Sequence, residues 1–225
     1  MFNFKNNPEL AYKIFQTLSV GYSYTYLEKL KINYILRNCK CRQDVLNKVI
    51  EVCGEPLTPF QRYIYAITYA WSNKEYRHLA IHYINWYLSN ELWDGAYLNK
   101  YKISIQSSEE QKIDHLCNMY NYLFSAYIGV YDFDNALKTA EYTIQIDASN
   151  PQGYMAKCEV LIKLNKLNEC KEWLEAQKKL PFYKFDKKHL ETAPENWFYF
   201  TINRLLNDVN EKIEKGYVYK PRKTK

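Results

Sequence analysis

The chain has 225 residues and a formal net charge of +6, and 47% of its residues are hydrophobic, which excludes an intrinsically disordered chain. No run approaches eighteen apolar residues and no apolar stretch follows the polar N-terminus, so we expect neither a membrane span nor a secretory signal. Only 6 glycines and 7 prolines are present, which leaves few turns and favours long helices.

Start and stop signals predict ten helices along the chain. Thr58 is followed by a proline and then by Gln61, which together make a capping box with proline at the first helical position. Asn7 and Asn150 also precede a proline, and Gly216 is placed to end the last helix. The predicted helices cover residues 8–19, 24–37, 42–53, 59–72, 74–89, 109–130, 132–147, 151–163, 167–179 and 194–215.

One long connection interrupts these helices. The segment 90–108 contains Trp93 and ends in a polar stretch, so it is predicted to be a loop that divides the chain in two. The helices before it show no clean period, whereas those after it carry a repeat. We therefore predict an irregular helical part at 1–107 and two repeats within 108–184, at 117–150 and 151–184. A capping helix at 185–219 and a basic tail at 220–225 complete the predicted solenoid.

The repeat is an echo with a period of 34 residues. In it, Tyr120, Tyr127, Phe133, Ala136 and Ala140 return as Tyr154, Leu161, Leu167, Cys170 and Leu174. Small residues return as small residues and large apolar ones as large, with Ala140 as the one exception. A period of this length is typical of stacked helix-turn-helix units.

Two turns complete the pattern. Residues 131–137 (YDFDNAL) have the form of a turn inside a helix pair, and residues 147–151 (DASNP) that of a turn between pairs. With these turns, and with Tyr120 and Tyr154 in the first helices, residues 117–184 resemble two tetratricopeptide repeats. The resemblance implies an all-α fold of antiparallel helix pairs stacked into a right-handed superhelix. Phe124 and Lys157 depart from the family pattern, which usually has a small and an apolar residue there.

The resemblance also implies a function. In this family the first helices of successive units line a concave groove, which would make the chain a non-catalytic scaffold that binds a protein or peptide. The groove-facing side chains are then Asn118, Asn121, Ser125 and Ile128 in the first unit and Gln152, Met155, Glu159 and Ile162 in the second. We expect no cofactor and no metal, because the six cysteines form no C-x-x-C pair. Free thiols indicate a reducing cytoplasm.

A ribonuclease is the first alternative. The run from Arg77 to His82 (RHLAIH) is similar to the R-[N/D/H]-x-x-x-H motif of the helical HEPN ribonucleases. On one helix these two residues lie about 140° apart, so a shared site would need paired protomers. In that site His82 would act as general acid and base, and Arg77 would stabilise phosphate charge.

Nucleic-acid binding is the second alternative. Basic residues interleave with aromatic ones in two clusters, at 29–42 and 178–188. Such clusters can contact phosphates and stack on bases, although lysine predominates over arginine and charged runs are usually solvated.

Overall fold

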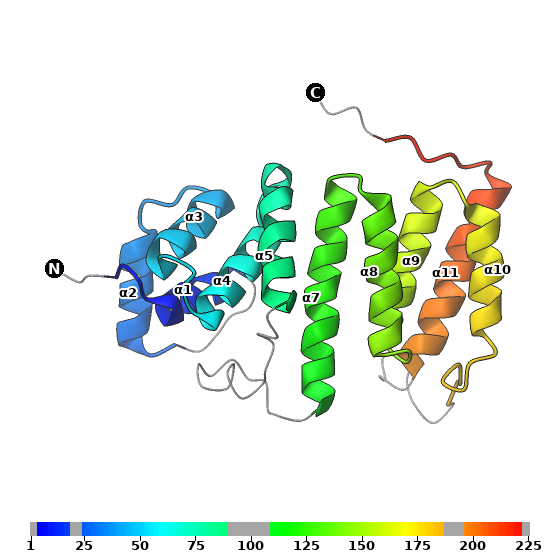
Figure 1. The fold of residues 1–225 in the computed structure, drawn as a ribbon, viewed down its shortest axis with the longest axis horizontal. Helices are drawn as coiled ribbons and strands as arrows, with labels where there is room; N and C mark the ends of the chain where they lie inside the picture. Colours follow the sequence, from blue (N-terminus) through cyan, green and yellow to red (C-terminus); the bar gives the residue numbers. More distant parts are fainter. Residues whose placement is uncertain (1–3, 19–23, 90–108, 187–195, 222–225) are drawn as a thin grey trace. The chain divides into compact units, whose positions relative to one another are not determined.

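The computed structural model describes residues 4–18, 24–89, 109–186 and 196–221. Helices account for 74% of these residues and no strand occurs among them, which confirms the all-α prediction. The chain forms two compact units, Met1–Val130 and Tyr131–Lys225, which we call unit 1 and unit 2 (Figure 1). The predicted boundary at 107/108 lies at the edge of the undescribed segment 90–108. The first predicted repeat, 117–150, spans the border between the two units.

Unit 1 is a bundle of short helices. Its described helices are α1 (Pro8–Gln16), α2 (Tyr26–Leu36), α3 (Arg42–Cys53), α4 (Pro59–Ala70), α5 (Arg77–Ser89) and α7 (Glu109–Gly129), with the 3-10 turn η1 (Lys74–Tyr76) before α5. Helix α1 packs on α3 and α4, and α5 packs on α4 and α7. Helix α3 has its predicted bounds, whereas the predicted helix at 8–19 ends three residues early and that at 74–89 begins with the 3-10 turn.

The predicted capping signals act as expected in unit 1. The backbone N–H of Gln61 donates to Thr58 Oγ1 (3.2 Å), and the N–H of Thr58 donates to Gln61 Oε1 (3.0 Å). At the start of α1 the N–H of Leu10 donates to Asn7 Oδ1 (3.0 Å). These bonds satisfy donors that the first turn of a helix leaves without partners.

The core of unit 1 contains a buried polar pair. The Tyr87 hydroxyl and His115 Nε2 are 2.9 Å apart, and the Tyr63 ring lies 5.6 Å from the imidazole. Burial lowers the pKa of His115 to about 4 and raises the pKa of Tyr87, because both charged forms lose hydration. The pair is therefore held in its neutral form at pH 7.

Unit 2 contains the regular part of the chain. Its described helices are α8 (Phe133–Ile146), α9 (Pro151–Lys163), α10 (Leu167–Gln177) and α11 (Trp197–Glu214). Helix α9 has its predicted bounds and packs on α8, α10 and α11. The contact with α8 is close at Gly153, where a Cβ atom would lie 2.9 Å from the backbone nitrogen of Ile144. Glycine is thus required there for the two helices to approach.

Burial follows the 34-residue echo in part. Ala136 and Ala140 are fully buried, and so are their counterparts Cys170 and Leu174. At two of the three large apolar positions the first-half member is less buried than its counterpart, and at the third both members are half-buried. Tyr154 and Leu161 are buried, whereas Tyr120, Tyr127, Phe133 and Leu167 are half-buried.

The segment after Gly216 folds back on unit 2. Gly216 has a φ of 59° and ends α11, as its position in the sequence predicts. The N–H of Tyr219 donates to Asn165 Oδ1 (2.6 Å), and Asn165 Nδ2 donates to the Tyr219 carbonyl (3.4 Å). The Tyr219 ring also meets Lys163 at 4.7 Å and the Phe133 ring at 6.3 Å. Residues 217–221, which we call the strap, therefore join the ends of three helices.

Candidate functional site

The first half of the predicted groove lies on α7 of unit 1. Asn118 and Ser125 are exposed there, and Asn121 and Ile128 are half-buried. Leu123 and Ala126, on the opposite side of the helix, are buried in the core of unit 1. The α7 positions therefore present amides and a hydroxyl to solvent, which can hydrogen-bond to a peptide backbone.

The second half of the predicted groove lies on α9 of unit 2. Met155 is 40% exposed and Glu159, one turn later, is also exposed. Gln152 and Ile162 are half-buried, Ile162 because it packs against the core of unit 2. Cys158, on the other side of the same helix, is fully buried. Helix α9 thus offers one flexible apolar side chain and one carboxylate to solvent.

Helix α11 contributes two residues to this surface that the sequence analysis missed. Arg204 Nη2 lies 3.8 Å from the sulfur of Met155. Trp197 is seven residues before Arg204, which places it on the same face of α11, and its side chain is 52% exposed. We call Met155, Glu159, Trp197 and Arg204 the α9/α11 surface. Its side chains combine an indole, a guanidinium, a thioether and a carboxylate.

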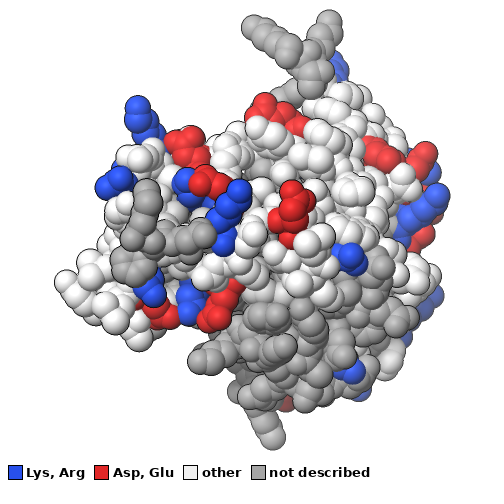
Figure 2. Space-filling view, turned by 60° about the vertical axis from the view of Figure 1, so that its left-hand side comes forward, with Lys and Arg blue, Asp and Glu red and all other residues white. Residues whose placement is uncertain are grey.

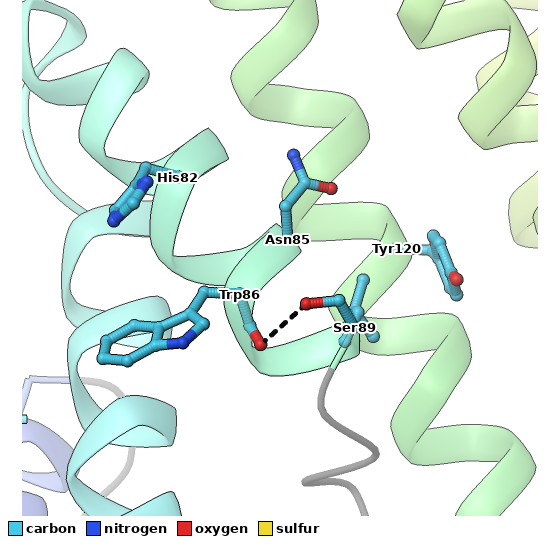
Figure 3. A pocket seen from close by; sticks show the side chains of 6 residues that line it. His82, Asn85, Trp86, Ser89 and Tyr120 are labelled. Carbon is cyan, nitrogen blue, oxygen red and sulfur yellow. Dashed lines mark hydrogen bonds between the residues drawn. The ribbon is translucent and has the colours of Figure 1, made fainter. Parts of the chain in front are cut away.

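Unit 1 has a separate hollow between α5 and α7. It has a volume of about 760 Å³ and is lined by His82, Asn85, Trp86, Leu88 and Ser89 of α5 and by Tyr120 of α7 (Figure 3). The Arg62 guanidinium lies 4.0 Å from the centre of a Trp86 ring. Asn85 donates to the Tyr127 hydroxyl (3.3 Å) and Ser89 to the Trp86 carbonyl (3.2 Å). These bonds within the chain occupy polar groups that a small ligand would need.

The two residues of the ribonuclease motif are in different environments. Arg77 Nη1 donates to the carbonyl of Ala70 (2.9 Å), and the Arg77 methylenes lie about 3.1 Å from where a Cβ at Gly129 would be. Arg77 thus links the end of α4 to the end of α7. His82 is exposed on α5 and lies beside the rings of Tyr83 and Trp86. This arrangement gives Arg77 a structural role within the chain.

Several basic residues of the two clusters already contact other side chains of the chain. In the cluster at 29–42, Arg37 lies 4.6 Å from the Tyr34 ring and Arg42 lies 4.7 Å from the Trp71 ring. In the cluster at 178–188, Lys178 pairs with Glu175 at 2.8 Å, and residues 187 and 188 lie outside the described residues. The ring of Tyr34 within the cluster and that of Trp71 at the end of α4 therefore each have a guanidinium on one face.

The cysteines within the described residues are free thiols. Cys158 and Cys170 are fully buried in unit 2 with their sulfurs 3.2 Å apart. The hydrogen bond between the Cys158 and Cys170 thiols and burial raise the pKa of Cys158, which makes that thiol a poor nucleophile. In the described parts of the chain, no three His, Cys, Asp or Glu side chains are grouped to hold a metal ion.

Two further findings concern the chain as a whole. None of the described helices is long and apolar enough to cross a membrane. Searches against protein-family models, curated proteins and solved structures found no match to this chain. A function must therefore be argued from the surfaces described above.

Proposed function

We propose that this chain is a non-catalytic scaffold of tetratricopeptide-like helical repeats that binds a protein or peptide. The observation that supports this proposal is the α9/α11 surface. Its exposed Met155 and Trp197 belong to helices whose other sides are buried, and Arg204 extends across from α11 to α9. Methionine adapts to irregular partners, and tryptophan and arginine are enriched among residues that dominate binding energy.

The chemistry of the surface indicates the class of ligand. Trp197 and Met155 would pack against apolar side chains, while Arg204 and Glu159 would bind groups of opposite charge. Trp197 and Arg204 are separated along α11 by about 10 Å, which an extended peptide covers in three or four residues. A peptide of mixed polarity therefore fits this surface better than a small molecule. A cytoplasmic location remains part of this proposal and rests on the free thiols.

A peptide selection tests the proposal. Phage that display random peptides are selected on the purified chain, and the Kd of an enriched synthetic peptide is then measured by fluorescence anisotropy. Met155→Glu and Trp197→Ala should each weaken binding by about tenfold or more, because each removes an apolar contact at the centre of the surface. Asn121→Ala tests whether α7 contributes to the same binding.

The control is Tyr142→Ala, which removes an exposed aromatic residue (53%) from α8 in the same unit. This variant should bind the peptide as tightly as wild type. Equal binding by all four variants, or a selection that enriches no peptide, would contradict the proposal. Melting curves establish that each variant is folded, since all four positions are at least partly exposed in the free protein.

A further inference from the structure

Helix α2 is apolar on two opposite sides. Ile32 and Ile35 face inwards and are 3% and 9% exposed. On the other side an apolar stripe is left in contact with solvent. It consists of Tyr26, Leu27, Leu30 and Tyr34, which are 74%, 68%, 48% and 55% exposed. We call these four residues the α2 stripe.

The spacing of the stripe is that of a helix-packing face. Leu27, Leu30 and Tyr34 are related as i, i+3 and i+7, and Tyr26 adds the i−4 neighbour of Leu30. A surface helix of a globular protein normally has one apolar side and one polar side. A helix with two apolar sides is suited to contacts on both, and within the described structure the outer side stays about half or more exposed, although its Tyr34 ring meets Phe4 and Arg37.

The helix that carries the stripe is hydrogen-bonded to α1 near its N-terminal end. The Lys13 side chain of α1 donates to Glu28 Oε1 (2.5 Å), and the N–H and hydroxyl of Thr25 donate to Glu28 Oε2 (3.0 and 2.9 Å). These hydrogen bonds, that from Lys13 above all, lower the pKa of Glu28 to about 2. The Tyr24 hydroxyl also donates to the Lys13 carbonyl (2.8 Å). The only carboxylate of α2 is thus already engaged by Lys13 and by the cap of its own helix.

The charges beside the stripe are all positive. Lys29 and Lys31 lie on its two sides, each roughly 100° around the helix from its centre line. Both are exposed, and neither forms an ion pair within the described part of the chain. Arg37 follows at the end of the helix and covers the Tyr34 ring at 4.6 Å. Figure 2 brings this end of unit 1 forward and shows Lys and Arg side chains there together with Asp and Glu side chains, among uncharged residues.

A hollow continues the stripe at its C-terminal end. It has a volume of about 450 Å³, and its walls include Phe4, Tyr34 and the cationic Lys5, Arg37 and Lys48. The Phe4 and Tyr34 rings have their centres 6.2 Å apart. One carboxylate, Glu51, also lines the hollow and pairs with Lys48. An acidic side chain at the end of a docked segment would therefore meet a net positive site.

We propose that the α2 stripe binds a partner helix whose apolar side is flanked by acidic residues. Self-association through the stripe would place Lys29 and Lys31 of two copies side by side with no free acid on α2 to offset them. A lipid surface would be held by four side chains over about 12 Å of helix, which is little apolar area for an interfacial anchor. An acidic amphipathic helix satisfies both the apolar spacing and the flanking lysines.

Designed peptides test this inference on the full chain. The probe is a fluorescein-labelled helical peptide of about 18 residues with a leucine stripe flanked by glutamates. One comparison peptide has lysine in place of every glutamate, and a second has serine in place of every leucine. Anisotropy titrations should show the acidic amphipathic peptide binding at least about tenfold more tightly than either comparison peptide.

Variants assign the binding to α2. Leu30→Asp should weaken binding of the acidic peptide by about tenfold or more, while Leu57→Asp should leave its binding unchanged. Leu57 is a matched control because it is 78% exposed in the same unit and outside α2. Lys29→Glu with Lys31→Glu should reverse the preference, so that the basic peptide binds more tightly. Circular dichroism shows that these surface variants retain wild-type helix content.

Four outcomes would overturn the inference. The acidic peptide could bind no better than the basic one, or Leu30→Asp and Leu57→Asp could behave alike. Sedimentation could instead show a wild-type dimer that Leu30→Asp abolishes, which would make a second copy the occupant. Finally, vesicles of phosphatidylcholine and phosphatidylserine could bind wild type but not Leu30→Asp, while the acidic peptide binds neither protein. That result would make a lipid surface the occupant. Because α2 and the α9/α11 surface lie in different units, their variants test the two proposals separately.

Discussion

The cores of the two units bury different kinds of side chain. In unit 1 the Tyr87–His115 pair lies at the centre, next to Tyr63 and beneath the surface of α5 and α7. In unit 2 most buried positions are filled by Leu161, Leu174 and other apolar or sulfur-containing side chains, and the uncharged Thr139, Thr143 and Asn196 are buried as well. Both described cores contain a buried hydrogen-bonded pair, Tyr87–His115 in unit 1 and Cys158–Cys170 in unit 2. Of the two pairs, the one in unit 1 includes an imidazole, which gains a positive charge in acid, whereas thiols stay neutral there.

The comparison predicts that acid weakens unit 1 more than unit 2. His115 is 8% exposed and its pKa is about 4, so the unfolded chain binds a proton between pH 6.5 and 4 that the folded chain does not. The contribution of His115 to the unfolding free energy of unit 1 is therefore fully present above about pH 6.5. It falls by about 3 kcal/mol as the pH is lowered from 6.5 towards 4. Hydrogen exchange followed by mass spectrometry at graded urea concentrations resolves the unfolding free energy of each unit.

Two histidine variants make this prediction specific. His115→Leu should remove the pH dependence from unit 1 even if it lowers stability overall, because Tyr87 loses its partner. His82→Gln, at an exposed position of the same unit, should leave the dependence intact. Equal acid sensitivity in the two units of the wild type would break the comparison.

Gly153→Ala should have the next largest effect, and it should act on unit 2. The added methyl would lie 2.6 Å from Ile144 Cγ1 and 2.9 Å from the Ile144 backbone nitrogen, so α8 and α9 must move apart. We expect a loss of roughly 1–3 kcal/mol in thermal or urea unfolding. Gly129→Ala in unit 1 is the control, since its methyl would meet only the Arg77 side chain at 3.1 Å. A larger loss from Gly129→Ala would mean that the close approach at Gly153 is not limiting.

The smallest effects are expected from the helix caps, one in each unit. Thr58→Ala removes the cap of α4, and Asn150→Ala removes the bond that the N–H of Gln152 donates to Asn150 Oδ1 (3.0 Å) at the start of α9. Each should lower stability by about 1 kcal/mol in its own unit. The same hydrogen-exchange experiment distinguishes them. If either variant weakens both units equally, the two units unfold as one cooperative domain.

The helices could be predicted because their signals are local. The caps at Thr58 and Asn150 fix where α4 and α9 begin, and Gly216 fixes where α11 ends. Helix ends that lack a glycine or proline stop signal are harder to place from the sequence. Helix α1, for example, ends at Gln16, three residues before its predicted end. Ala136 and Cys170, which the echo pairs, are both buried, because small residues recur where neighbouring helices approach.

The site was harder to predict because it depends on contacts between distant segments. Met155 and Glu159 are exposed on α9, and their role in a groove stays a prediction. Arg204 and Trp197 were missed because α11 was interpreted as a cap rather than as a neighbour of α9. The α2 stripe was missed for another reason. Its apolar residues have ordinary helical spacing, and only the packing of Ile32 shows which side of α2 faces inwards.

The strap has a mechanical consequence for unit 2. The two bonds between Asn165 and Tyr219 tie the segment after α11 to the turn that follows α9, close to the start of α8. A pulling force applied beyond residue 221 would load these two bonds before it reached α11. The helix would then be protected from being unzipped turn by turn from its C-terminal end. Unit 2 is therefore anchored at the C-terminal end of α11, where unfolding under force would otherwise begin.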